Sequence, residues 1–355
     1  MRKMDKTIVR DQEVFVGIDV SKRSYTVAMR SAGALVYRCT VPSRYAHLRA
    51  LWARLPGCDI HAVYEAGFSG FGLYDDLVGD GIAARVTPPS KVARTGDRVK
   101  TDRRDAHTLA QQLEYGMLRR CRVPTPAARV AREWSRYLNQ LIGQQTRLKA
   151  QIKSRLDWNG VAPELDAHRR WSRVYRAQVL ALVGDDGPLA VIVGDMLMRL
   201  GEIERRVTEI KLRLRELARS DRYRESVDLL QSAPGIGWLT AIRLVLEWQD
   251  LRDFPNGEAF VSYLGLTPSE YSSGERVRRG GITRQGNGKV RAWLIEAAWK
   301  AITKDPVLGS RFRRLAPGQA KGMRKRAIVA VARTLALRLR ACWMSGQSYE
   351  IGLVR

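Results

Sequence analysis

The sequence predicts an α/β domain, followed by a pair of long helices and a mainly helical C-terminal region. Between residues 13 and 116, short apolar, β-branched runs alternate with helical segments, which is typical of an α/β layer. From about residue 130 the apolar spacing becomes that of long amphipathic helices, and shorter helices follow. We therefore expect three domains, at residues 12–125, 126–225 and 226–345.

The first domain opens with strand-like runs. Residues 13–20, EVFVGIDV, are apolar and β-branched, and residues 25–29 and 34–39 continue as short strands around a Ser-Ala-Gly break. Helical spacing follows at 43–56, then a strand in DIHAVYEA, a helix in FGLYDDLVGDG and a helix at 103–116. This order predicts a strand meander that continues into alternating helices and strands.

The second domain carries a heptad pattern. Its apolar residues follow a 4-3-4-3-4-3 spacing: Met196, Leu200, Ile203, Val207, Ile210, Leu214 and Leu217. An earlier apolar face begins at Trp134 and Leu138, so two long helices pack as a coiled coil or helical hairpin. Such a pair either stabilises one monomer or forms a dimerisation arm, and both remain open.

The third domain contains two amphipathic helices rich in Arg and Lys, at 288–303 and 321–342, and a tight turn at Pro234-Gly235-Ile236-Gly237. Glycines in such a turn let backbone N–H groups approach a phosphate, as in a helix-hairpin-helix element. We therefore name Gly235 and Gly237 as candidate nucleic-acid contacts. A plain interhelical turn explains the same residues and stays open.

The charge balance indicates a polyanionic partner. The chain has 62 Lys and Arg against 36 Asp and Glu, a formal net charge of +26, and these basic residues occur in every third of the sequence. Surface Lys and Arg draw in nucleic acid by displacing counterions from phosphates. A membrane partner is not expected, because no segment approaches the roughly 20 apolar residues of a spanning helix and no signal-peptide run is present.

Cysteine and histidine usage argues against zinc and disulfides. The four cysteines lie far apart without a CxxC pair, and the four histidines are equally scattered. We expect a reducing compartment, the cytoplasm.

Four carboxylates form the first candidate site. Asp19 and Glu65 each end a predicted strand, and Asp102 and Asp105 share one face of a helical turn. A fold tolerates such a cluster when cations neutralise it, and oxygen-only ligands suit Mg²⁺ or Mn²⁺. Two such ions would stabilise the entering and leaving oxygens of a phosphodiester displacement. Each acid taken alone is better explained as a strand-end cap or a salt-bridge partner, and only the four together favour a metal site.

A serine-rich turn forms the second candidate site. Ser272, Ser273 and Gly274 are followed by basic residues, which we name as candidate nucleic-acid contacts: Arg276, Arg278, Arg279, Arg284, Lys289 and Arg291. An activated serine hydroxyl can attack a phosphodiester while arginines offset the developing charge. The residues alone favour a simpler interpretation, a phosphate-binding loop in which serine only donates a hydrogen bond.

The motifs resemble, in order, those of DEDD-type insertion-sequence transposases of the 110/1111 family, the bridge-RNA-guided serine recombinases. They are GIDVSK, YEAG, VKTDRRDA, SAPGIGWLTA, YLGLTPSEYSSG and QGNGKVR, and the likeness runs from about residue 14 to 340. The resemblance implies an RNase H-like domain related to Holliday-junction resolvases, a coiled-coil arm, and a transposase domain that carries a catalytic serine.

The resemblance also assigns roles. It implies that Asp19, Glu65, Asp102 and Asp105 bind Mg²⁺, and that Ser273, with Ser272 as the alternative, attacks DNA to give a 5′-phosphoserine intermediate. It implies double-stranded DNA at the element ends and target as substrate, and a structured guide RNA. We add the hypothesis that dimers pair into a tetramer on two duplexes, at the nucleoid of a bacterium.

Two other functions stay open at this point. A junction-resolving nuclease would use metal and water, with Ser273 only binding phosphate, and would leave free DNA ends. A basic nucleic-acid-binding protein without activity would keep its carboxylates for structure. The acidic quartet argues against the second, because a passive binder of polyanions gains nothing from acids gathered near its ligand.

Overall fold

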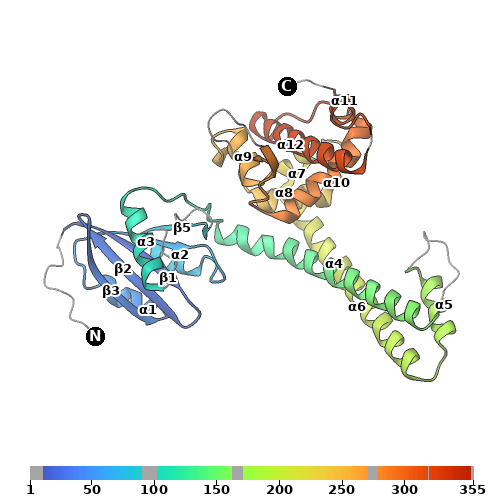
Figure 1. Cartoon of the computed structure of the whole chain (residues 1–355), viewed down its shortest axis with the longest axis horizontal. Helices are drawn as coiled ribbons and strands as arrows, with labels where there is room; N and C mark the ends of the chain where they lie inside the picture. The colour runs from blue at the N-terminus through green and yellow to red at the C-terminus, as the bar shows by residue number, and fades with distance from the viewer. Residues whose placement is uncertain (1–10, 90–101, 162–170, 271–278, 319, 353–355) are drawn as a thin grey trace. The chain divides into compact units, whose positions relative to one another are not determined.

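The computed structural model describes residues 11–89, 102–161, 171–270, 279–318 and 320–352 (Figure 1). The chain divides by internal contacts into an N-terminal unit, Met1–Pro124, and a C-terminal unit, Thr125–Arg355. The predicted α/β domain followed by a mainly helical region is confirmed. None of the described helices combines the length and apolar content needed to cross a membrane.

The N-terminal unit is built on a mixed five-stranded sheet of order β3-β2-β1-β4-β5. Strands β1 (Glu13–Val20), β2 (Ser24–Ser31) and β3 (Ala34–Pro42) form an antiparallel meander. Strands β4 (Asp59–Glu65) and β5 (Ala83–Thr87) extend the sheet parallel to β1. The sheet therefore changes from antiparallel to parallel pairing at β1, its central strand.

Helices cover both faces of this sheet. On one face, α1 (Tyr45–Trp52) and α2 (Gly72–Gly79) pack with Val16 and Ile18 in the larger core of the unit. On the other face, α3 (Asp102–Glu114) packs on β1, β2 and β4. Because side chains alternate along a strand, Gly17 and Asp19 of β1 lie on the α3 face.

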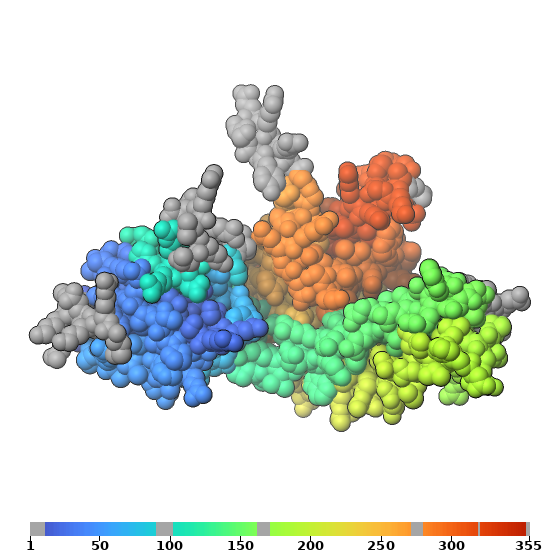
Figure 2. Space-filling model, turned by 60° about the horizontal axis from the view of Figure 1, so that its bottom comes forward, coloured from blue at the N-terminus to red at the C-terminus, as the bar shows by residue number. Residues whose placement is uncertain are grey.

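The C-terminal unit begins with a helical arm. Helices α4 (Pro126–Trp158) and α6 (Pro188–Arg219) lie side by side, joined through α5 (Arg173–Val183), as Figures 1 and 2 show. The heptad residues Leu200 and Leu214 of α6 are fully buried. The predicted pair of long helices is therefore present, and its apolar seam is the contact between α4 and α6.

The remaining helices form one core with the base of the arm. These elements are α7 (Arg224–Gln231), α8 (Trp238–Trp248), a short 3-10 turn (Leu251–Asp253), α9 (Gly257–Tyr263), β6 (Pro268–Glu270), β7 (Arg279–Ile282), α10 (Gly288–Lys304), α11 (Pro306–Leu315) and α12 (Lys321–Ser345). Leu138 of α4 and Leu214 of α6 belong to the same apolar cluster as Leu244 of α8 and Val331 of α12. The base of the arm is thus part of the hydrophobic core of the C-terminal unit.

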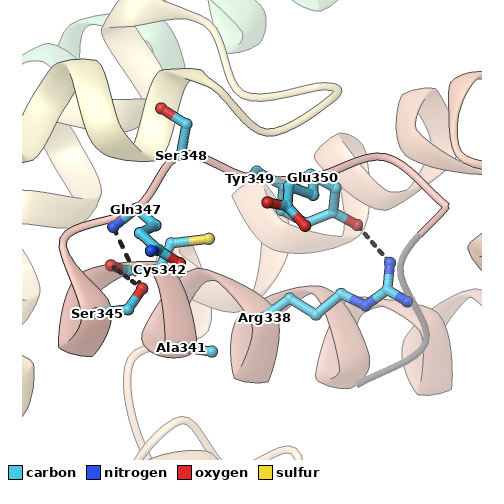
Figure 3. Close-up of a pocket in the computed structure, with 8 residues that line it drawn as sticks. All are labelled: Arg338, Ala341, Cys342, Ser345, Gln347, Ser348, Tyr349 and Glu350. Carbon is cyan, nitrogen blue, oxygen red and sulfur yellow. Dashed lines mark hydrogen bonds between the residues drawn. The ribbon is translucent and has the colours of Figure 1, made fainter.

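A buried carboxylate ties the C-terminal segment to this core. Asp305 is fully buried, and its Oδ2 accepts hydrogen bonds from the Tyr349 hydroxyl at 2.6 Å and from Arg338 at 2.8 Å. Arg338 also donates from Nη1 to the Tyr349 hydroxyl at 2.7 Å (Figure 3). The backbone N–H of Tyr349 donates to the Ser232 hydroxyl at 2.8 Å. Burial, followed by the hydrogen bond to Asp305, raises the pKa of Tyr349 above its ordinary value. The segment after α12 therefore bridges the α7–α8 turn and the start of α11.

Candidate active site

Asp19 and Glu65 lie at the same edge of the sheet. The parallel pairing of β1 with β4 runs to Ile18 opposite Tyr64, and the two acids are the next residue on each strand. Neighbouring strands are about 4.8 Å apart, so their carboxyl ends place these side chains next to each other. Both residues are half-buried. The expectation that two strand ends bring two acids together agrees with this register.

Helix α3 lies in direct contact with β1 because residue 17 has no side chain. A Cβ atom at Gly17 would lie 2.0 Å from the carbonyl oxygen of Ala106 and 2.5 Å from the backbone nitrogen of Ala110. Such distances are far inside van der Waals contact, so any larger residue forces helix and strand apart. Glycine at this position therefore fixes the closest approach of α3 to the sheet.

The contacts of α3 along β2 show in which direction the helix runs. Ala106 packs beside Ala28, whereas Glu114 at the other end of the helix bonds Arg30 and Gly33. The helix therefore runs along β2 and antiparallel to β1. Its first turn consequently points toward the end of β1 that carries Asp19.

Asp102 and Asp105 occupy that first turn. Asp102 is exposed and Asp105 is half-buried. Backbone placement thus directs all four predicted acids, Asp19, Glu65, Asp102 and Asp105, to one edge of the sheet.

A trio other than the predicted acids brings potential ligand atoms together, whereas Asp19, Glu65, Asp102 and Asp105 form no such group among the described residues. Among the described residues, the three potential metal ligands that lie within 4.8 Å of one another are Glu13, Asp59 and His61, at the opposite edge of the sheet. The His61 Nε2 lies 3.1 Å from Asp59 and 3.7 Å from Glu13, and its ring stacks on Phe15. Sequence reasoning missed this trio because its members come from two strands and become neighbours only through the β1–β4 register.

A buried arginine holds α3 on the sheet. Arg30 of β2 donates from Nε to Glu114 at 2.6 Å and from Nη1 to His107 Nε2 at 3.0 Å. The other Glu114 oxygen accepts the backbone N–H of Gly33 at 2.6 Å. Burial, and then the charge of Arg30, lowers the pKa of His107. A lone arginine in a strand gives no sequence signal of such a role, so Arg30 was not predicted.

The serine turn lies between two short paired strands. Strands β6 and β7 pair antiparallel through Pro268 with Ile282 and Glu270 with Arg279, and the Ser269 hydroxyl donates to the carbonyl of Gly281 at 2.8 Å. The residues between them lie outside the described part of the chain, and they include Ser272, Ser273, Gly274, Arg276 and Arg278. The structure therefore defines both ends of the segment that holds the predicted nucleophile.

The basic residues after β7 differ in their surroundings. Arg284 and Lys289 are exposed. Arg291 is half-buried and donates from Nη1 to the carbonyl of Leu264 at 3.0 Å, and burial lowers its pKa. Arg291 thus joins α10 to the end of α9, a structural contact that the sequence pattern did not reveal.

The predicted glycine turn lies between α7 and α8. Gly235 has a φ of +86°, and a Cβ there would lie 2.3 Å from the carbonyl oxygen of Ala297 in α10. Gly237 is exposed and directly precedes α8, with no atom within 4 Å of its missing Cβ. Gly235 is therefore required for packing inside the unit, whereas packing against the described residues does not require a glycine at position 237.

Two sequence models of known transposases match this chain. The model described as Transposase for the DEDD-type IS110 proteins covers residues 16–158, and the model for the Transposase IS116/IS110/IS902 family covers residues 227–313. The first match contains all four acids, and the second contains the glycine turn, the residues Ser272 and Ser273, and the whole of α10. The chain belongs to the IS110 family of transposases.

Relatives that match over most of their length agree with this assignment. The chain is 28% identical over 295 residues to a putative transposase, y4qE, of Sinorhizobium fredii, covering 81% of this chain and 72% of that one. It is 22% identical over 284 residues to the transposase for insertion sequence element IS1111A of Coxiella burnetii, covering 80% and 76%. It is 24% identical over 305 residues to the transposase for IS1533 of Leptospira borgpetersenii, covering 81% and 85%.

Membership of the IS110 family settles the class of activity. The chain is a DNA transposase, and its DEDD-type domain implies the use of a divalent metal ion. The predictions of a transposase and of a nucleic-acid partner are thereby confirmed at this level. The oxygen-only donor set at the β1–β4 edge fits such an ion.

Proposed function

We propose that this IS110-family transposase cuts and rejoins DNA through a covalent serine intermediate, using Mg²⁺ held by Asp19, Glu65, Asp102 and Asp105. The placement of Asp19 and Glu65 at adjacent strand ends, with Asp102 and Asp105 in the first turn of α3, supports the proposal. The strand order β3-β2-β1-β4-β5, with β1 antiparallel to β2 and parallel to β4, supports an RNase H-like domain.

The acids hold the ion from three separate elements. Asp19 and Glu65 come from adjacent strand ends, and Asp102 and Asp105 come from the first turn of α3. When bound, Mg²⁺ polarises the scissile phosphate and stabilises charge on its oxygens. Arg30 and Gly17 act indirectly, because they set the position of α3 and hence of two of the acids.

In the cutting step, Ser273 is the nucleophile. Its hydroxyl oxygen forms a bond to phosphorus, the bond from phosphorus to the 3′-oxygen breaks, and the serine proton ends on the released 3′-hydroxyl. The 5′-phosphoserine link conserves the free energy of the cleaved phosphodiester bond. Attack by a new 3′-hydroxyl on its phosphorus therefore rejoins the DNA and releases the serine hydroxyl. Arg276, Arg278, Arg279 and Arg284 offset the charge that develops on the phosphate.

Nucleic-acid binding involves further partners in this proposal. A structured guide RNA selects donor and target, and double-stranded DNA is bound at the element ends and at the target. Lys289 and the exposed backbone at Gly237 contribute phosphate contacts, and the net charge of +26 supports them. Dimers pair into a tetramer on two duplexes, and size measurement of the active nucleoprotein complex tests this assembly.

The chemistry is tested by trapping the adduct. Purified protein is incubated with its element's end DNA, flanking RNA and Mg²⁺, and the products are separated on a denaturing gel. We expect a protein–DNA adduct that disappears in Ser273→Ala, in Asp102→Ala and with EDTA, and that persists in the matched Ser272→Ala variant.

Other outcomes assign other functions. Metal-dependent cleavage that survives Ser273→Ala, with free DNA ends, identifies a nuclease that uses water. An adduct lost in Ser272→Ala alone moves the nucleophile by one residue. DNA binding without cleavage in the wild type, unchanged by Asp102→Ala, contradicts the catalytic proposal.

A further inference from the structure

A groove of about 500 Å³ lies in the C-terminal unit between helix α4, the end of α8 and the start of α10. Helix α4 contributes Arg136, Asn139 and Arg147 to its walls, and the first turn of α10 contributes Lys289. The groove belongs to neither the carboxylate edge nor the serine turn. Its lining is polar and basic, which distinguishes it from the apolar seam of the arm.

The groove carries net positive charge, because its lining holds Arg136, Arg147 and Lys289 against one acid. Its one acid, Glu247, is buried and lies 3.5 Å from Arg136 and 4.0 Å from Arg132, so its charge is offset inside the unit. Arg147 and Lys289 are exposed, and no ion pair found among the described residues involves either. Two cationic side chains therefore remain to bind an anion.

The side-chain amides of Asn139 and Asn287 offer hydrogen-bond donors to a ligand in the groove. Arg243 is buried, stacks on Trp293 at 3.9 Å, and donates from Nη2 to the Oδ1 of Asn139. The Oδ1 of Asn287 accepts the N–H of Lys289 at 3.0 Å. A guanidinium and a backbone N–H can only donate, so both amide oxygens are used inside the protein. Each amide is left with its NH₂ group, which binds hydrogen-bond acceptors.

A glycine interrupts the wall of the groove. Gly143 lies inside the 33-residue helix α4, where glycine is less favourable than alanine. A Cβ at Gly143 would meet only the Nη1 of Arg147, at an ordinary 3.6 Å. Packing within the chain therefore does not require glycine at this position. A ligand that passes close to the α4 backbone would require it.

We propose that this groove binds the sugar–phosphate backbone of one DNA strand next to the bond that the enzyme cuts. Cationic and amide donors on both walls match phosphate oxygens. A volume of about 500 Å³ fits one sugar–phosphate strand better than the whole width of a duplex, of which the major groove alone takes about 12 Å. Lys289 lies seven residues after the end of β7, the strand that follows the segment holding Ser273 in the sequence. The choice of DNA over RNA rests on the proposed cleavage of DNA.

Binding in the absence of metal tests the groove separately from catalysis. Fluorescence anisotropy is measured in EDTA with labelled single-stranded DNA, duplex DNA and single-stranded RNA of one sequence, over a range of salt concentrations. Arg147→Ala and Lys289→Ala are compared with Arg155→Ala, which removes an exposed charge from α4 outside the groove. We expect each groove variant to weaken binding of single-stranded DNA and to reduce the log–log salt slope by about 0.7, as loss of one phosphate contact does.

A second variant separates binding from folding. Gly143→Ala improves helix propensity, so we expect a melting temperature higher by about 2–4 °C together with weaker binding of single-stranded DNA. A purely structural glycine would change the melting temperature and leave binding unchanged.

The proposal is overturned if Arg147→Ala and Lys289→Ala give the salt slope of Arg155→Ala, or if Gly143→Ala binds as tightly as the wild type. If the groove variants lose affinity only for RNA or only for duplex DNA, the assignment of the groove to a single DNA strand is overturned. Failure of the catalytic proposal has a different signature. The wild-type protein would then form no protein–DNA adduct, although its DNA binding without metal would still be weakened by Arg147→Ala and Lys289→Ala.

Discussion

Replacing Gly17 with alanine tests how closely helix α3 must lie on strand β1. The added Cβ would lie 2.0 Å from the Ala106 oxygen, against at least 3.4 Å for ordinary contact. Helix α3 must therefore move away by more than an ångström and take Asp102 and Asp105 with it. Misplacement of catalytic groups by about 1 Å costs about 100-fold in rate, and overpacking costs about 1–3 kcal/mol of stability.

The assay measures adduct formation by Gly17→Ala over a range of Mg²⁺ concentrations, beside thermal unfolding. We expect about 100-fold slower cleavage, with a higher Mg²⁺ requirement, in a protein that remains folded. Gly72→Ala is the matched control, because no atom lies within 4 Å of a Cβ at that position of the same unit. Wild-type cleavage and metal requirement in Gly17→Ala would refute the view that this contact positions the two aspartates.

Three further substitutions probe buried contacts. Arg30→Met leaves Glu114 buried without its cation, and denaturant unfolding should show a loss of about 3–5 kcal/mol, with part of it restored in Arg30→Lys. Tyr349→Phe removes a donor from buried Asp305 and should cost about 1–3 kcal/mol in the same measurement, whereas no loss would mean that another donor takes its place. Gly235→Ala drives a methyl group into a carbonyl of α10, so calorimetry should show a lower melting temperature, while Gly237→Ala, the control, should unfold close to wild type.

Local patterns predicted much of the fold and part of the site. The run EVFVGIDV is the first strand, residue for residue, because its alternation and β-branched content are local properties. The predicted helices at 103–116 and 288–303 occur at Asp102–Glu114 and Gly288–Lys304. Placement of Asp19 and Glu65 at strand ends followed from the same local patterns.

Contacts between distant residues were not predictable in the same way. The bond from Arg30 to Glu114 joins residues 84 positions apart, and nothing near Arg30 in the sequence indicates its partner. The roles of Gly17 and Gly235 depend on helices that cross them, α3 and α10. For Gly235 the sequence suggested a phosphate contact, and the close packing on α10 appears only when the chain is folded.

The hydrogen bonds that join Tyr349 to Asp305 and Ser232 bear on the order in which the two units fold during synthesis. All four acids of the sheet edge lie within the first 124 residues, a unit with its own core. Domains fold as units during synthesis, N-terminal first, so this half takes shape while the rest of the chain is still being translated. The C-terminal unit gains its last buried hydrogen bonds only after Tyr349 has left the ribosome. A nascent chain therefore folds the unit that carries the four predicted acids before the unit that carries the predicted serine nucleophile is complete.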